Sequence, residues 1–373
     1  MKRNSTIQTV RIAQIIGKML AGGVETVVFN YYRMLDHDKY QFDFYYDADS
    51  TVEPPEDLIK MGARFIKLPP YQKIHEYIRE LRKCFRMEHY SIVHSHLNTI
   101  SVFPLYAAWR ENIPVRIAHN HSVPGGHEGT RGILKRVLKR FAKIFPTDYA
   151  ACSEKAGRWL FGNREYDAGN VTILKNAIDM GKFMMPKKTA YARRSALGLT
   201  NKFVVGGVGR FTYQKNIPFL INVFSIIKER KENAVLLLVG DGEEREMIEE
   251  EVHKRKLDDE VIMTGSVSDP ENYYGLCNVV VVPSLFEGFS LVTLESQAAH
   301  IPVVVSKVVP KEAIISNGCK YLDVNDPPRV WANNAIEMSE RTVVLSDEAK
   351  QYDIFTQTVK LEEWYTSVIK KRV

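Results

Sequence analysis

Strand and helix signals alternate along almost the whole chain, and this alternation constrains the fold more than any other feature. Short apolar runs such as residues 235–239 and 279–282 lack the alternation of apolar and polar residues that is typical of a strand with one solvent-exposed face. They therefore predict parallel strands that are covered on both faces. Helical patterns follow these runs, for example at residues 71–89 and 217–230. The chain is predicted to be an α/β protein built from βα units around parallel sheets.

The alternation runs through the chain twice, which predicts two domains. A chain of 373 residues also exceeds the usual size of a single core. The first series starts near Val10, and the second restarts at residues 203–207. We expect two Rossmann-like domains whose strands point their carboxyl ends at a ligand cleft. The expected divisions are a first domain at 1–183, with a hinge from residue 175, a second domain at 184–350, with a linker at 184–189, and a terminal helix at 351–373.

Composition and charge exclude several classes of protein. Hydrophobic residues make up 45% and charged residues 26% of the chain, as in an ordinary globular protein. No apolar run approaches the roughly 20 residues that span a bilayer, and the N-terminus lacks the pattern of a secretory signal, so we expect a cytoplasmic protein. The net charge of +6 suits an anionic small molecule or membrane surface, and no nucleic-acid module is evident. The cysteines are widely scattered, without metal or disulfide spacing, and are expected to be buried thiols: Cys84, Cys152, Cys277 and Cys319.

The stretch 284–295, SLFEGFSLVTLE, predicts a phosphate-binding turn. It follows the apolar run 279–282 and leads into a helical pattern, which indicates a strand, a tight turn and a helix start. Gly288 permits a ligand to approach the backbone, and the first amides of a helix bind anions because they lack intrahelical partners. Glu287 and Glu295 bracket this turn. A phosphate beside two carboxylates requires cations from another part of the chain.

The segment GVGRFTYQKN supplies such cations through Arg210 and Lys215. Both follow the predicted strand 203–207, and loops that follow parallel strands gather at one edge of a sheet. Arginine binds a diphosphate as a planar fork and lysine binds it as a point charge. The loops VGDG and TGSVSD follow later strands in the same way, and the second offers backbone groups around Val267 to a flat base.

Two features of the first half are candidate ligand contacts. Gly22 and Gly23, in GGVE, lie between the first strand and the first helix, where a glycine pair either permits close approach to an anion or serves packing alone. Four histidines lie at the ends of two predicted neighbouring strands: His94, His96, His119 and His121. Without a nearby carboxylate or cysteine ligand we expect no metal there. One of these histidines is expected to hydrogen-bond a polar substrate.

A basic segment runs from Arg131 to Lys143 and contains six basic residues and no acidic residue. Its apolar residues recur at helical spacing. One interpretation is a surface helix that packs on the sheet. The other is a basic amphipathic helix on anionic lipid headgroups, and both hold if the basic edge faces a membrane.

The combined motifs resemble the retaining family 4 glycosyltransferases of the GT-B fold, especially bacterial enzymes of capsular and exopolysaccharide assembly. EGFSLVTLE is similar to that family's signature of two glutamates, here Glu287 and Glu295, and GVGRFTYQKN resembles its phosphate-binding segment. GGVE, SIVHSH, VRIAHNHS and LKNAIDMGKF match its other landmarks in the right order. The resemblance covers nearly the whole chain.

The resemblance implies a donor site for a nucleoside-diphosphate sugar, with UDP as the expected nucleotide. Arg210 and Lys215 would hold the diphosphate, Glu295 the ribose hydroxyls and Glu287 the transferred sugar. Val267 would lie at the base. Gly23, from the first domain, would approach the donor phosphate. The amides that would contact the phosphates belong to Phe289, Ser290, Leu291 and Val292.

The same resemblance implies a pocket histidine at the end of VRIAHNHS, and His121 fits this position slightly better than His119, without settling the choice. The catalytic candidates are therefore His121, Glu287, Arg210 and Lys215. The expected acceptor is lipid-linked or a polysaccharide. No resident cofactor or metal is expected. The sequence departs from the family at SKVVPKEAI, where Lys307 and Lys311 replace a glycine-rich loop and bear on sugar recognition.

Other functions remain open at this point. A sugar-nucleotide epimerase, a phosphorylase with pyridoxal phosphate and a non-catalytic sugar-nucleotide-binding protein are compatible with the same fold. A nicotinamide-dependent dehydrogenase is less compatible, because the first strand–helix turn, IIGKMLAGGVE, lacks the GxGxxG pattern.

Overall fold

The computed structural model describes residues 9–20, 22–123 and 129–372. The chain divides into two compact units, Met1–Ala177 with Gln351–Val373, and Ile178–Lys350. The sequence placed the domain boundary after residue 183, whereas the structure places it after Ala177. The reason is that helix α8 (Met180–Phe183) packs against α13 (Leu291–Ala298) of the second unit. Of the loop expected at 122–130, residues 124–128 lie outside the described residues.

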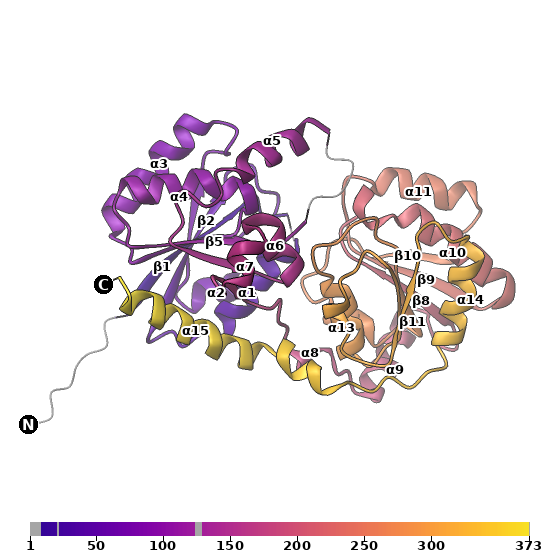
Figure 1. Cartoon of the computed structure of the whole chain (residues 1–373). Helices are drawn as coiled ribbons and strands as arrows, with labels where there is room; N and C mark the ends of the chain where they lie inside the picture. Colours follow the sequence, from indigo (N-terminus) through magenta and orange to yellow (C-terminus); the bar gives the residue numbers. More distant parts are fainter. Residues whose placement is uncertain (1–8, 21, 124–128, 373) are drawn as a thin grey trace, which may run out of the picture. The chain divides into compact units, whose positions relative to one another are not determined.

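In the described part of the first unit, seven parallel strands form one sheet in the order β3–β2–β1–β4–β5–β6–β7 (Figure 1). Chain order and spatial order differ because the connection after β3 returns past β2 and β1 and places β4 beside β1. The strands are β1 Val10–Gly17, β2 Tyr40–Asp47, β3 Arg64–Leu68, β4 Ile92–Ser95, β5 Val115–Asn120, β6 Asp148–Ala151 and β7 Val171–Ile173.

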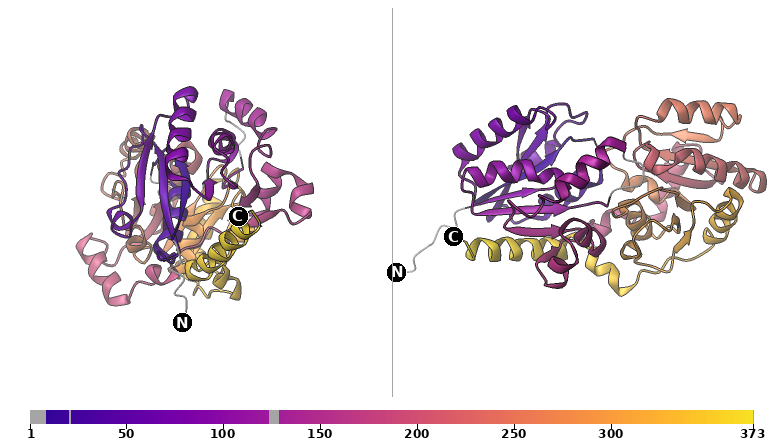
Figure 2. Two further views of the ribbon diagram at one scale, coloured as in Figure 1. Left: turned by 90° about the vertical axis from the view of Figure 1, so that its left-hand side faces the viewer. Right: turned by 45° about the horizontal axis from the view of Figure 1, so that its top comes forward.

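Helices cover both faces of this sheet (Figures 1 and 2). The helices α3 and α4 pack against each other, and α1 packs against α15. Their bounds, with the short 3-10 turn η1, are α1 Gly23–Met34, α2 Glu56–Lys60, α3 Ile74–Glu88, η1 Asn98–Ser101, α4 Val102–Arg110, α5 Gly129–Lys139, α6 Glu154–Phe161, α7 Asn163–Asp167 and α15 Ile354–Lys370. Covering both faces explains why β1, β2, β4 and β5 are almost entirely buried.

The terminal helix α15 belongs to the first unit and reaches the middle of its sheet. Asp353 caps it by accepting a hydrogen bond from the Thr356 amide at 3.2 Å. Tyr365 packs against the rings of Tyr40 and Phe42 of β2, and its hydroxyl accepts a hydrogen bond from Gln14 Nε2 at 3.1 Å. The last helix of the chain therefore contributes a polar atom to the interior of the first unit.

In the described part of the second unit, six parallel strands form a sheet in the order β10–β9–β8–β11–β12–β13. The strands are β8 Phe203–Val208, β9 Ala234–Val239, β10 Val261–Met263, β11 Val279–Val282, β12 Val303–Ser306 and β13 Cys319–Leu322. Around them lie α9 Lys187–Ala196, η2 Tyr213–Lys215, α10 Ile217–Arg230, α11 Arg245–Lys254, α12 Glu271–Tyr274, η3 Lys311–Ala313, α14 Pro328–Met338 and η4 Asp347–Tyr352. The doubly wound α/β architecture expected from the sequence is confirmed in both units.

Several elements differ from the expectation. The predicted linker at 184–189 runs into α9, which buries none of its residues and so shows no apolar stripe. The strand β13 is a partly exposed edge strand. The sequence did not predict it, because its polar residues interrupt any apolar run. Helix α14 starts at the second of two consecutive prolines, Pro328, and inserts Trp331 into the core of the second unit. Helix α5 ends at Lys139, and residues 140–144 form turns rather than extending the helix.

No helix within the described ranges is long and apolar enough to cross a membrane.

Candidate functional site

The turn between β11 and α13 is the centre of the candidate site in the second unit. Phe289 and Ser290 are buried in this turn. Ser290 caps α13, because its Oγ accepts a hydrogen bond from the Thr293 amide at 3.3 Å. The first-turn amides of Leu291 and Val292 have no intrahelical acceptor, as at any helix start. The positive end of α13 is therefore directed at the turn, which suits an anion.

Glu287 lies buried beside this helix start and is held by three donors. Its side chain is only 5% exposed. Lys215 Nζ donates to Oε1 at 2.6 Å and Ser284 Oγ donates to the same oxygen at 2.9 Å. Gln214 Nε2 donates to Oε2 at 3.3 Å. These donors compensate the loss of water around a carboxylate, a loss that costs several kcal/mol per ion when it is uncompensated. The pairing of Lys215 with Glu287 brings two predicted site residues together.

Backbone hydrogen bonds join the four loops that follow successive strands of the sheet. Each bond connects one loop to its neighbour: Leu285 N to Gln214 O at 2.8 Å, Phe211 N to Asp241 O at 2.9 Å and Gly240 N to Gly265 O at 3.1 Å. The carboxyl edge of the second sheet is therefore one connected surface, as expected for loops that follow neighbouring parallel strands. Val267 lies half-buried in the last of these loops.

Gly240, in the loop VGDG, permits the closest of these approaches. Its φ is 144°, and a Cβ built there would lie 2.0 Å from the carbonyl oxygen of Gly209. Only glycine fits a position with this φ and this backbone contact. The glycine of this loop therefore serves the packing of the site loops on one another.

Arg210 pairs with a carboxylate of the neighbouring loop. Its Nη2 pairs with Glu243 Oε2 at 2.8 Å, and the two side chains are 37% and 60% exposed. Among the described residues, Lys215 is thus the cation that pairs with Glu287. An exposed pair contributes little to stability. The expected contact of Arg210 with a diphosphate stays a prediction.

Glu295 lies further along α13 and is almost completely buried. Tyr274 of α12 donates its hydroxyl hydrogen to Glu295 Oε2 at 2.5 Å. Burial raises the pKa of Glu295 to about 7, while the hydrogen bond from Tyr274 opposes this shift. The two glutamates of the signature therefore differ, since Glu287 is paired with an ammonium group and Glu295 with a phenol.

The loop after β12 carries the residues that depart from the family pattern. Lys307 Nζ lies 3.8 Å from Asp323 in an exposed pair, and Lys311 is exposed in η3. Gln297 of α13 holds this loop in place, because its buried amide accepts from Ile315 N at 2.9 Å and donates to Ala313 O at 2.9 Å. The sugar specificity expected from these lysines stays a prediction.

The glycine pair of the first unit marks the start of α1. Gly23 is the exposed first residue of the helix and Gly22 is its N-cap. Glu25 turns back over this end, because its Oε1 accepts from the Leu20 amide at 2.8 Å. A carboxylate already lies near the helix start, so the expected contact of Gly23 with a phosphate stays a prediction.

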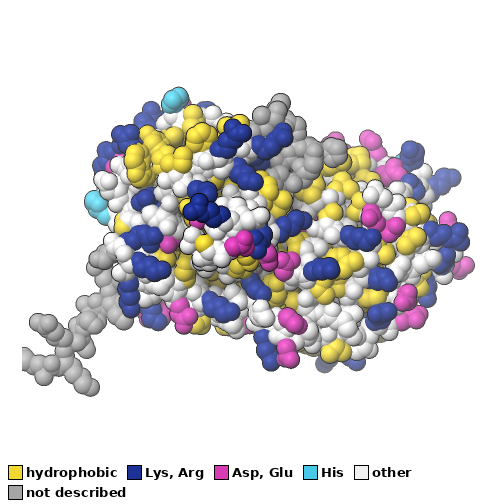
Figure 3. All heavy atoms as spheres, viewed as in Figure 1, with side chains coloured by type: hydrophobic (Ala, Val, Ile, Leu, Met, Phe, Trp, Pro, Cys, Tyr) yellow, Lys and Arg dark blue, Asp and Glu magenta, His cyan; other side chains and the backbone are white. Residues whose placement is uncertain are grey.

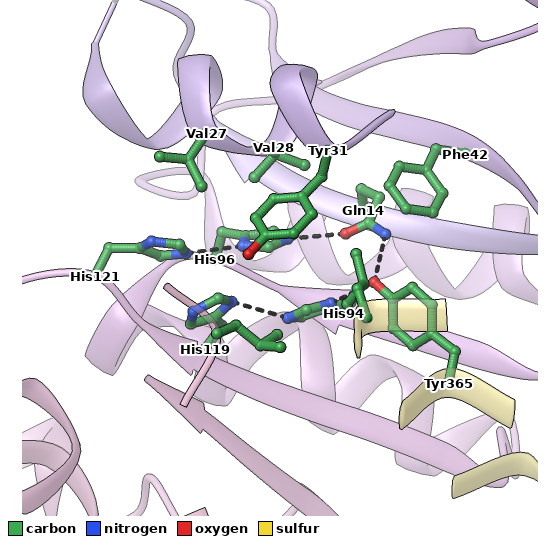
Figure 4. A pocket seen from close by; sticks show the side chains of 12 residues that line it. Gln14, Val27, Val28, Tyr31, Phe42, His94, His96, His119, His121 and Tyr365 are labelled. Carbon is green, nitrogen blue, oxygen red and sulfur yellow. Dashed lines mark hydrogen bonds between the residues drawn. The ribbon is translucent and has the colours of Figure 1, made fainter. Parts of the chain in front are cut away.

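The four histidines of the first unit form one buried cluster with Gln14 and Tyr365 (Figure 4). The rings of His119 and His121 are tilted by 31° with centroids 3.9 Å apart, and both line the same pocket. Burial holds the pKa of His121 at about 3 and those of the other three well below the usual value, so all four are neutral. The structure places both candidates for the pocket histidine side by side and does not separate them.

Three of these histidines also have the spacing of a metal-binding group. His94, His96 and His119 each offer a ring nitrogen, and these atoms lie within 4.8 Å of one another. His94 and His96 use both ring nitrogens in hydrogen bonds, for example His94 Nε2 with His119 Nδ1 at 3.1 Å, whereas His119 Nε2 has no partner among the described residues. The expectation that no metal binds here stays a prediction.

The sequence analysis did not identify several residues that support the site. Gln214 and Ser284 bind Glu287, and Tyr274 binds Glu295. Gln14 and Tyr365 connect the histidines. Gln214 and Ser284 lie inside the motifs around Lys215 and Glu287, which was a usable signal. Tyr274, Gln14 and Tyr365 carry no local signal, because only the tertiary fold brings them to their partners.

Two family models together match most of the chain. The model described as Glycosyltransferase Family 4 matches residues 21–182, and the model described as Glycosyl transferases group 1 matches residues 192–339. EpsF of Bacillus subtilis (strain 168), named as a glycosyltransferase, is 30% identical over 329 residues, which are 86% of each chain. The capsular polysaccharide biosynthesis glycosyltransferase CapH of Staphylococcus aureus is 24% identical and covers 96% of this chain and 99% of its own.

A third relative and two solved structures are also similar. The UDP-Gal:alpha-D-GlcNAc-diphosphoundecaprenol alpha-1,3-galactosyltransferase of Escherichia coli is 25% identical over 84% of this chain and 83% of its own. Anabaena Alr3699/HepE in complex with UDP and glucose superposes with a TM-score of 0.79 at 17% identity, covering 96% of this chain and all of that one. Sucrose-phosphate synthase of Thermosynechococcus elongatus superposes with a TM-score of 0.75 at 21% identity, over 97% and 100%.

These findings do not favour the dehydrogenase, the epimerase or the non-catalytic alternatives. The chain belongs to the family 4, group 1 glycosyltransferases and has their GT-B fold.

Proposed function

We propose that this glycosyltransferase moves a sugar from a nucleoside-diphosphate sugar, with UDP as the nucleotide, to a lipid-linked or polysaccharide acceptor in the synthesis of a cell-surface glycan. Relatives named for capsular polysaccharide synthesis and for a diphosphoundecaprenol acceptor support the glycan and the acceptor. The complexes of HepE with UDP and with UDP-glucose support the nucleotide. The enzyme needs no resident cofactor in this proposal, and it works in the cytoplasm.

The pairing of Lys215 with Glu287 is the observation that carries the proposal. An ammonium group has three hydrogens, and the contact with Glu287 at 2.6 Å uses one of them. The others are free to face a diphosphate at the start of α13. Glu287 fixes the position of the ammonium group and retains acceptor capacity for a sugar hydroxyl. One pair thus connects the two chemical halves of a nucleotide sugar.

The reaction breaks the bond between the anomeric carbon and the diphosphate oxygen, and the bonding electrons leave with the diphosphate. Lys215, Arg210 and the α13 amides stabilise the charge that develops on this leaving group, which lowers the barrier in a preorganised polar site. The acceptor hydroxyl oxygen then bonds to the anomeric carbon, and its proton passes to the departing phosphate oxygen. No carboxylate is assigned as a nucleophile.

We predict that Lys215→Ala and Glu287→Gln each reduce transfer by at least about 100-fold, because each removes a contact to the leaving group or the sugar. The donor is first selected by thermal shift with a panel of nucleotide sugars, and product formation is then measured by mass spectrometry. The matched control is Lys228→Ala, which breaks a partly buried pair with Glu260 at 3.0 Å in the same unit. If both site variants transferred sugar at the rate of the Lys228→Ala control, the assignment of Lys215 and Glu287 to the site would be refuted.

We also propose retention of the anomeric configuration, which follows from attack on the face that the diphosphate leaves. The product made from an α-linked donor is expected to be an α-glycoside. Proton NMR of the purified product distinguishes the two anomers through the coupling of the anomeric proton. A β-glycoside would overturn the retaining mechanism while leaving the donor site in place.

The raised pKa of Glu295 predicts a pH dependence of donor binding. We propose that the ionised carboxylate accepts from both ribose hydroxyls, and ionisation increases as the pH rises through about 7. The affinity for UDP-glucose is therefore expected to fall by up to about tenfold between pH 8 and pH 6. Isothermal titration calorimetry measures this, and Glu295→Gln should bind more weakly with little pH dependence. An unchanged pH profile in the variant would contradict the role of Glu295.

A basic and apolar surface on the first unit supports contact with a membrane. Large apolar side chains are exposed there beside cations, and Figure 3 shows the two kinds mixed over the region of α4 and α5. The apolar residues are between 45% and 59% exposed: Trp109, Leu134, Val137, Phe141 and Ile144. Arg136 and Arg140 are exposed among them. We propose that the segment from Arg131 to Lys143 binds an anionic membrane surface, where a lipid-linked acceptor lies.

We predict that Arg136→Glu/Arg140→Glu weakens binding to vesicles of anionic phosphatidylglycerol by more than about tenfold, since each basic residue contributes about 1 kcal/mol at such a surface. Vesicle co-sedimentation measures the binding, with neutral phosphatidylcholine vesicles as the reference. Lys187→Glu/Lys188→Glu on α9 makes the same charge change at an exposed site in the other unit. Equal loss of binding in both variants would point to net charge rather than to this surface.

A further inference from the structure

Two hydrogen-bond chains start from the amide of Gln14 and end on the pocket histidines (Figure 4). In the first chain, Gln14 Oε1 contacts His96 Nε2 at 2.8 Å, and His96 Nδ1 contacts His121 Nε2 at 2.8 Å. In the second, Gln14 Nε2 contacts the Tyr365 hydroxyl at 3.1 Å, the hydroxyl contacts His94 Nδ1 at 2.8 Å, and His94 Nε2 contacts His119 Nδ1 at 3.1 Å. Both chains lie in the interior of the first unit.

Each chain ends on a ring nitrogen without a partner. Among the described residues, His119 Nε2 and His121 Nδ1 are buried and have no hydrogen-bond partner. Both side chains are more than nine-tenths buried, and both line the same pocket. A buried polar atom without a partner costs about 1–3 kcal/mol, so these two atoms mark a place where a ligand group binds.

The orientation of the Gln14 amide determines the proton positions along the first chain. The amide oxygen accepts, so His96 must carry its hydrogen on Nε2. A neutral histidine has one ring hydrogen, so His96 Nδ1 accepts from His121 Nε2. The free Nδ1 of His121 is then an acceptor.

The second chain starts from the donor side of the Gln14 amide and therefore ends on a donor. The amide nitrogen of Gln14 donates to the Tyr365 oxygen. The phenol hydrogen has no other partner among the described residues, so it is donated to His94 Nδ1. His94 therefore donates from Nε2 to His119 Nδ1, and the free Nε2 of His119 is a donor. All four histidines share the tautomer with hydrogen on Nε2.

Turning the Gln14 amide by 180° reverses every bond in both chains. All four histidines then carry hydrogen on Nδ1, His121 becomes the free donor and His119 the free acceptor. Either orientation presents one donor and one acceptor on the two adjacent rings. Because an amide offers one side of each kind, the chains cannot end in two donors, which would suit an anion, or in two acceptors, which would suit a cation.

We propose that Gln14 and Tyr365 are positioning residues that fix the tautomers of His119 and His121, so that this histidine pair binds a hydroxyl group of a sugar. A hydroxyl donates to one ring and accepts from the other, which matches the pair. The assignment to a sugar rests on the proposed function, whereas the coupling of the tautomers does not. The terminal helix α15, through Tyr365, thereby becomes part of the machinery that prepares the pocket.

Nitrogen NMR of the full chain labelled with 15N-histidine tests the coupling without any substrate. Protonated and unprotonated ring nitrogens resonate far apart, so each tautomer is read directly. We expect four neutral histidines with a common tautomer at neutral pH. Two results would overturn the proposal. One is a wild-type protein with different tautomers within one hydrogen-bond chain. The other is one zinc per protein by elemental analysis, with loss of these signals on chelation.

Gln14→Glu gives the sharpest change, because a carboxylate accepts on both sides. The first chain keeps its direction, whereas Tyr365 now donates to the carboxylate and reverses the second chain. His94 and His119 are expected to move to the Nδ1 tautomer while His96 and His121 stay unchanged. A protonated carboxyl group in this variant would mimic the amide, so the spectra are recorded up to pH 9. Spectra with all four tautomers unchanged at that pH would refute the role of Gln14.

Tyr365→Phe removes the phenol donor and is expected to perturb His94 and His119 alone. The matched control is Tyr40→Phe, which removes another tyrosine hydroxyl contact to α15, to Thr366 Oγ1 at 2.7 Å, keeps the ring that packs on Tyr365 and breaks no hydrogen bond of either chain. We expect a roughly tenfold lower kcat/KM with Tyr365→Phe and less than a twofold change with the control, as for the loss of one hydrogen bond. Equal effects of both variants on tautomers and kcat/KM would indicate a structural role only.

Discussion

The buried contact between Lys215 and Glu287 is the interaction on which the rest of the second unit's site depends. Leaving a buried carboxylate without its cation costs roughly 3–5 kcal/mol. The β8 loop must therefore hold its lysine against the turn that precedes α13, and the 2.8 Å bond from Leu285 N to Gln214 O fixes the same approach through the backbone. The charge pair and the backbone bond together set the distance between the start of α13, where we propose that a phosphate binds, and the carboxylate that we propose binds the sugar.

This constraint also explains why two glutamates in one motif differ. Glu287 lies against a cation, while Glu295 lies against the phenol of Tyr274 and has a pKa of about 7. One carboxylate is thereby suited to organise charge, and the other to bind hydroxyl groups in a manner that depends on pH. In the first unit we propose that neutral histidines bind a sugar hydroxyl, with proton positions set by the amide of Gln14 and the phenol of Tyr365 rather than by charge.

Local patterns in the sequence predicted the fold to the extent that burial determines them. Strands covered on both faces, such as β9 and β11, are apolar throughout and were found, whereas the edge strand β13 and the exposed helix α9 were not. The motifs located Lys215 and Glu287. They did not show that Arg210 pairs with Glu243, because that contact depends on which loops are neighbours in the sheet.

The histidine cluster shows the same limit more clearly. Spacing placed four histidines on neighbouring strand ends, but their hydrogen-bond directions depend on Gln14 of β1 and on Tyr365, which lies 351 residues later in the chain. Long-range partners of this kind leave no local signal. They arise only after α15 has packed on the first sheet.

The central claim is that Lys215 and Glu287 act as one unit, and a double-mutant cycle on donor binding tests it most directly. Binding of UDP-glucose is measured by calorimetry for the wild type, Lys215→Met, Glu287→Gln and the double variant. The account predicts a coupling energy of about 1–3 kcal/mol, with the double variant no weaker than the worse single variant. Strictly additive losses would contradict it.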